Sequence, residues 1–74
     1  MKTAIENYLH EQIKECRKNV EESVQAIREK DLNDFELIVH VNVIDGNLEI
    51  ITNTKRQLDL MNTVIIQKEK KIYA

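Results

Sequence analysis

The stretch from Phe35 to Thr52 constrains the fold more than any other part of the chain. Apolar residues recur at every second position over 35–43, and many of them are β-branched. Asp45-Gly46-Asn47 follows and contains the only glycine of a chain that has no proline. A turn of this composition between two such runs is the strongest short-range signal for a β-hairpin. We therefore predict an antiparallel hairpin with strands over about 35–44 and 48–52.

A long helix is predicted before the hairpin. Thr3 and Glu6 have the spacing of a capping box, which marks a helix start. The apolar residues that follow are three or four positions apart, and this spacing places them on one face of a helix. They are Ile5, Leu9, Ile13, Cys16, Val20, Val24 and Ile27. We expect this helix to run to about Lys30 and the chain to break at 31–34.

The region after the hairpin fits a shorter helix. Thr54 and Gln57 form a second candidate capping box, and apolar residues follow it at helical spacing. Residues 63–72 fit either a helix or a short strand. The predicted fold is α+β in the order α-β-β-α, as a single domain over 1–74. An all-helical fold is the alternative, which Gly46 and the β-branched residues of 35–52 disfavour.

The small size of the chain points to a second subunit. Chains below about 70–80 residues often need a disulfide, a metal or a partner for stability. Cys16 is the only cysteine among the 74 residues, so no disulfide can form within one chain. We therefore expect a homodimer, whose interface combines the uncharged flank of the first helix with the second face of the hairpin. The candidate interface residues are Tyr8, Ser23, Ala26, Ile38, Ile44 and Ile51.

The sequence contains no motif for catalysis, metal binding or cofactor binding. Cys16 lies on the apolar stripe without a basic neighbour that would activate it, and His10 lacks the second histidine of a zinc protease helix. We expect no enzyme activity, no cofactor and no metal. The net charge is −2, and no apolar run is long enough for a membrane span or a signal peptide. A single cysteine is typical of a reducing cytoplasm.

Two surfaces are candidates for binding a partner. The first is an acidic face on the long helix, opposite its apolar stripe, which suits a protein partner with a basic surface. Its residues are Glu11, Glu15, Glu22 and Glu29. The composition suggests an AT-rich genome, so we expect a non-enzymatic regulator or inhibitor encoded by a phage or mobile element. The alternative is a weak nucleic-acid-binding protein, with contacts from Lys68, Lys70, Lys71 and Tyr73.

Overall fold

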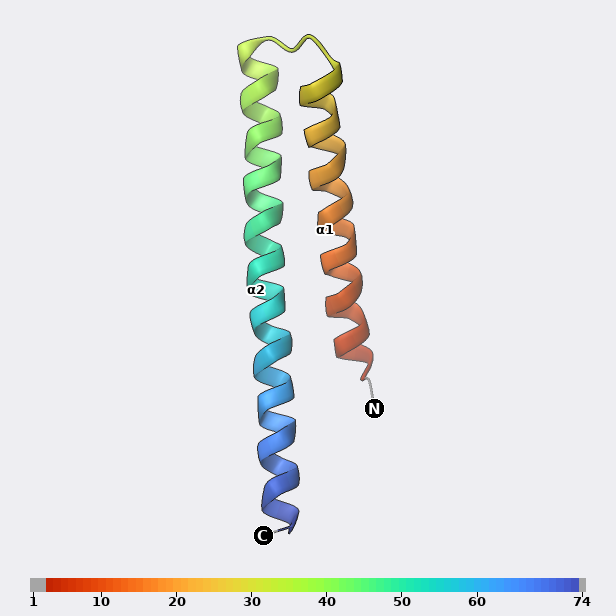
Figure 1. Cartoon of the computed structure of the whole chain (residues 1–74), viewed down its shortest axis with the longest axis vertical. Helices are drawn as coiled ribbons and strands as arrows, with labels where there is room; N and C mark the ends of the chain where they lie inside the picture. Colours follow the sequence, from red (N-terminus) through yellow and green to blue (C-terminus); the bar gives the residue numbers. More distant parts are fainter. Residues whose placement is uncertain (1–2, 74) are drawn as a thin grey trace.

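The chain folds into two antiparallel helices joined by a short connection (Figure 1). The computed structural model describes the backbone of residues 3–73 and the side chains of residues 3–64. Helix α1 spans Ala4–Glu29 and helix α2 spans Asp34–Tyr73. No strand occurs within residues 3–73. The predicted α+β fold is therefore wrong, and the all-helical alternative describes the molecule.

Helix α1 begins and ends where the sequence predicted. Thr3 is the N-cap in an extended conformation, and its Oγ1 accepts a hydrogen bond from the backbone N–H of Glu6 at 3.1 Å. At the other end, the backbone N–H of Lys30 donates to the carbonyl of Ala26 at 3.0 Å, and Lys30 itself is extended. Thr3 as the N-cap and the long N-terminal helix are confirmed.

The predicted β-hairpin is the first half of helix α2. Gly46 lies inside this helix, and no residue of the described backbone has a positive φ, so the turn at Asp45-Gly46 and both strands were wrong. Thr54 was predicted as the cap of a separate C-terminal helix. Instead it lies in the middle of α2 and is only 3% exposed. Residues 63–72, which fitted either state, continue the same helix.

Helix α2 starts at a reciprocal cap that the sequence analysis missed. The Oδ1 atom of Asn33 accepts a hydrogen bond from the backbone N–H of Glu36 at 2.8 Å. In return, the backbone N–H of Asn33 donates to Oε1 of Glu36 at 3.5 Å. This is a capping box with asparagine in place of serine or threonine, and it fixes a helix start just before Phe35.

A seven-residue repeat explains why 35–52 is helical despite its alternation. Leu37, Ile44, Ile51 and Leu58 are each seven positions apart, so they follow one side of a helix that packs against a neighbour. A glycine inside a helix costs about 1 kcal/mol relative to alanine, and β-branched residues cost less than that. Packing of this stripe against α1 outweighs these local costs, since tertiary contacts supply most helical stability in proteins.

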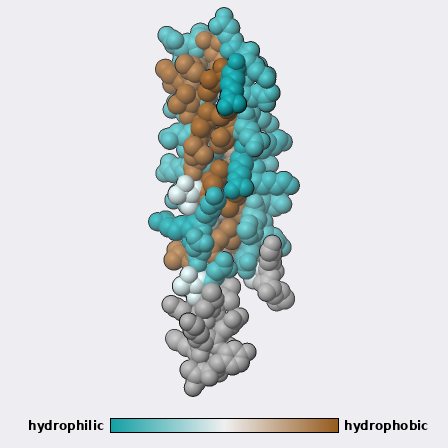
Figure 2. All heavy atoms as spheres, in the orientation of Figure 1, coloured by the Kyte–Doolittle hydropathy of each residue, from teal (hydrophilic) through white to brown (hydrophobic). Residues whose placement is uncertain are grey.

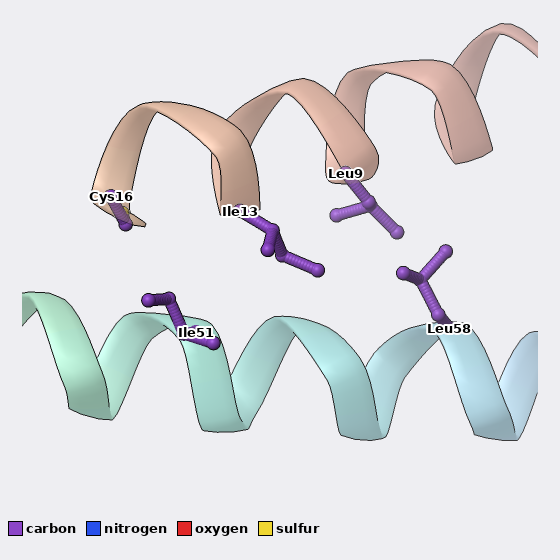
Figure 3. Close-up of a cluster of buried hydrophobic side chains, with 5 residues drawn as sticks. All are labelled: Leu9, Ile13, Cys16, Ile51 and Leu58. Atoms are coloured by element: carbon purple, nitrogen blue, oxygen red, sulfur yellow. The ribbon is translucent and has the colours of Figure 1, made fainter. Parts of the chain in front are cut away.

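The core lies between the two helices, in the half of the hairpin away from the connection. Leu9, Ile13 and Cys16 of α1 meet Ile51 and Leu58 of α2, and all five side chains are buried (Figure 3). The three α1 residues belong to the apolar stripe that the sequence predicted. This core is small, because a pair of helices can enclose only one row of side chains from each.

The molecule is long and thin, with extents of 62 × 16 × 14 Å. Within the described residues, neither helix contains a stretch that is apolar enough to cross a bilayer.

Candidate interaction surfaces

Polar side chains fill the contact between the helices near the connection. Nδ2 of Asn19 donates a hydrogen bond to Oδ1 of Asn47 at 3.2 Å. One layer nearer the connection, Nδ1 of His40 lies 3.2 Å from Oγ of Ser23, at hydrogen-bonding distance. Buried polar groups need such partners, and no buried side-chain nitrogen or oxygen of the described residues lacks one. The polar layers align the helices but bury little apolar surface.

An apolar face covers one side of the hairpin near the connection. Arg17 and Lys55 line one groove on this side, together with Ile13 and Leu58. A residue that lies seven, fourteen or twenty-one positions away from one of these four is on the same side of its helix. On this basis the apolar face includes Val20, Val24 and Ile27 of α1 with Leu37, Val41, Ile44 and Leu48 of α2. Figure 2 shows apolar side chains gathered in a band along this half of the molecule.

The side chains of the apolar face are far from covered. Leu37, Val41 and Leu48 are 39%, 50% and 48% exposed, and Val24, Ile27 and Ile44 are half-buried. Scattered exposed apolar residues are normal on a protein, but a contiguous group marks a contact surface. The predicted oligomer interface included only Ile44 from this face.

The same side of the hairpin becomes charged farther from the connection. The groove there is lined by both acidic and basic groups, among them Glu6, His10, Arg17, Lys55 and Asp59. Arg17 and Lys55 occupy the positions that Val24 and Leu48 hold one heptad nearer the connection. Charges of both signs alternate in this groove, so it does not have the single sign expected of an anion or cation site.

The predicted acidic residues form an exposed row on α1. Glu11, Glu15, Glu22 and Glu29 are separated by four, seven and seven positions, which keeps them on one side of the helix, and all four are exposed. We call this row the acidic stripe. Oε1 of Glu29 accepts a hydrogen bond from Nε2 of Gln25 at 2.9 Å. Glu11 and Glu15 also line the groove beside Arg17 and Lys55, and Glu29 lines a second hollow together with Val24.

The residues predicted for an oligomer interface are divided between the surface and the interior. Tyr8 and Ile38 are 66% and 58% exposed, while Ala26 and Ile44 are half-buried. Ser23 and Ile51 are buried between α1 and α2 of one chain. The uncharged flank of α1, which was expected in the same interface, contacts α2 of the same chain through Asn19 and Ser23.

The residues predicted for nucleic-acid contact lie at the end of α2. Lys68, Lys70, Lys71 and Tyr73 are part of this helix, but their side chains lie outside the described residues. Their role therefore stays a prediction.

Metal-ligand side chains do not converge in the described part of the chain. No three histidine, cysteine, aspartate or glutamate side chains come together there in a way that could hold a metal ion. Cys16 is buried against the apolar core rather than exposed beside a base. Comparisons of the chain with protein-family models, with curated proteins and with solved structures give no match. Evidence about function therefore comes from the surfaces themselves.

Proposed function

We propose that this chain is a small non-enzymatic interaction protein that docks a basic protein partner through the acidic stripe. The observation that carries the proposal is the single row of exposed carboxylates Glu11, Glu15, Glu22 and Glu29 on one side of α1. The row has one dominant sign, with the exposed Lys18 among its four carboxylates, and such a row on a rigid element attracts an oppositely charged surface and sets its orientation. Because α1 packs against α2, the backbone that carries this row is already ordered before a partner binds.

The rest of the described surface supports binding rather than catalysis. The groove beside Arg17 and Lys55 has mixed charge and is open to solvent, and Cys16 is enclosed by apolar side chains. An active site needs a nucleophile or base held beside a converging partner. We also place the protein in the reducing cytoplasm, because its one cysteine is free and buried.

A charge-reversal experiment tests the acidic stripe. The variant Glu11→Lys, Glu15→Lys, Glu22→Lys should keep the circular-dichroism spectrum of the wild type, since all three side chains are exposed. Binding to the native partner, captured from host lysate on tagged protein and identified by mass spectrometry, should weaken tenfold or more, which corresponds to about 1.4 kcal/mol. Binding should also weaken with salt, because exposed charges are screened.

A matched variant controls for the change in net charge. Asp45→Lys, Glu49→Lys, Asp59→Lys alters the same number of exposed carboxylates on α2 and should leave capture of the partner unchanged. Equal loss from both triple variants, or no loss from either, would contradict the proposal. If the stripe variant instead bound DNA or RNA more tightly and with a steeper salt dependence, the nucleic-acid alternative would be favoured.

A further inference from the structure

The hairpin exposes more surface than a folded chain of its mass should. Its accessible surface is 6289 Å², whereas a compact monomer of 8.7 kDa exposes about 4,700 Å². The excess is roughly 1,500 Å², and a stable protein–protein interface needs about 800 Å² from each partner. One copy therefore has enough uncovered surface to form such an interface.

The apolar face has the pattern of a helix-bundle interior. A pair of helices needs only one narrow apolar seam, whereas a helix in a four-helix bundle also carries apolar residues beside that seam. Val24, Val41 and Leu48 hold these additional positions near the connection. The interior of one hairpin is small in comparison, since only five apolar side chains among the described residues are buried.

We infer that a second copy of this chain covers the apolar face, so that two hairpins form a four-helix bundle. Another copy of the chain is a partner that is present wherever the chain is made, and it carries the same exposed apolar face. The apolar contact uses Val24, Val41 and Leu48 rather than the carboxylates of the acidic stripe, so the pairing goes beyond the proposed function and does not depend on it.

The charges beside the apolar face select the arrangement of the two copies. The face is about 16 Å long, from Leu37 to Leu48 along α2. A twofold axis through its middle brings the connection of one copy level with Arg17 and Lys55 of the other. Residues 28–36, around the connection, carry four acidic side chains against the bases Arg28 and Lys30, a balance of −2. The staggered antiparallel arrangement therefore brings this acidic end to the level of the bases Arg17 and Lys55 at both ends of the apolar contact.

Two other arrangements are less favourable. Antiparallel hairpins that overlap along their whole length would press the apolar face against Arg17 and Lys55, whose charged groups would lose water. Hairpins with both connections at the same end would bring the same cationic residues of the two copies together, and the acidic connections as well. Like charges in contact cost free energy that the staggered arrangement avoids.

Light scattering with a matched pair of valine variants tests the pairing. At tens of micromolar, the wild type should have twice the chain mass of 8.7 kDa. Val41→Glu, on the apolar face, should shift the protein to the monomer or unfold it. Val39→Glu changes an exposed valine on the other side of α2 and should leave the dimer intact. A helical wild-type monomer at this concentration, or equal dissociation by both variants, would overturn the inference.

Cross-linking tests the arrangement even if Val41→Glu unfolds. In a Cys16→Ala background, Asp31→Cys combined with Lys55→Cys should form disulfide-linked dimers under oxidation. These positions are roughly 30 Å apart within one chain, so a link between them must join two copies. Efficient linkage of the Asp31→Cys single variant to itself would contradict the staggered arrangement. A wild-type monomer that still captures the basic partner would overturn the pairing and leave the acidic stripe standing. A wild-type dimer whose capture of the partner is unaffected by the stripe variant would overturn the acidic stripe and leave the pairing standing.

Discussion

Asn19 and Asn47 meet across the two helices, with Nδ2 of Asn19 donating to Oδ1 of Asn47 at 3.2 Å. Nδ2 of Asn47 donates in turn to the carbonyl of Val43 at 2.7 Å. Asn47 is thereby tied both to its own helix and to α1. A paired asparagine at a core position of helical packing specifies the register, because any shift leaves both amides without a partner.

We predict that Asn47→Ala lowers the free energy of unfolding by about 1–3 kcal/mol, because it leaves the part-buried Asn19 amide without its partner. Urea denaturation followed by circular dichroism measures this loss. Asn42→Ala, at an exposed position of the same helix, is the control and should change stability by less than about 0.5 kcal/mol. Joint replacement, Asn19→Leu with Asn47→Leu, should restore stability, and a joint variant weaker than Asn47→Ala would contradict the pairing.

Gly46→Ala should stabilise the protein by about 0.5–1 kcal/mol, since Gly46 lies inside a helix and alanine is the better helix former. An added Cβ meets no atom within 4 Å, so no clash offsets the gain. Gly46→Pro should cost about 3 kcal/mol or more through the lost hydrogen bond and the ring clash. A lower denaturation midpoint for Gly46→Ala would instead indicate the left-handed backbone of a hairpin turn.

Two leucines on α2 form a matched pair for the core. Leu58 is 8% exposed and Leu60 is 58% exposed. Leu58→Ala should lower the free energy of unfolding by about 2–3 kcal/mol, at the low end for buried leucines because the core is thin. Leu60→Ala should change it by less than about 0.5 kcal/mol. Similar midpoints for the two variants in thermal denaturation would mean that the helices pack through another face.

The cap of α2 also contributes to stability. Asn33→Ala removes the acceptor for the Glu36 backbone N–H and should lower the free energy of unfolding by about 1 kcal/mol. Asn33→Asp keeps an acceptor and adds a negative charge at a helix N-terminus, so it should be at least as stable as the wild type. The order of the three denaturation midpoints checks this prediction, and a destabilised Asn33→Asp would contradict it.

The sequence predicted α1 well because its signals agree. The capping residues Thr3 and Glu6, the spacing of Leu9, Ile13 and Cys16, and the break near residue 31 all indicate one helix, and each has its expected place in the structure. The exposure of the acidic stripe followed from the same helical register. Local and tertiary preferences support the same conformation in this part of the chain.

Helix α2 was harder to predict because two periods coexist in it. Val39, Val41 and Val43 alternate, while Leu37 and Ile44 begin a seven-residue repeat that continues to Leu58. The second set of contact positions in this repeat contains the polar residues His40, Asn47 and Thr54, so hydrophobicity alone hides it. Strand propensity depends strongly on context. The detectable signals were the continuation of the repeat past Gly46 and the capping box at Asn33.

The antiparallel arrangement has a consequence for the order in which the chain folds. Ser23 and His40 are 17 positions apart, and the next pair outward, Asn19 and Asn47, is 28 apart. Once the inner pair has formed, the outer pair closes little additional free chain, so each step outward has a low entropic cost. Such topologies fold within microseconds to milliseconds. We expect the hairpin to close like a zipper from its connection, so that the residues next to Asn33 govern how fast the molecule forms, while the distant core around Leu58 governs how long it stays formed.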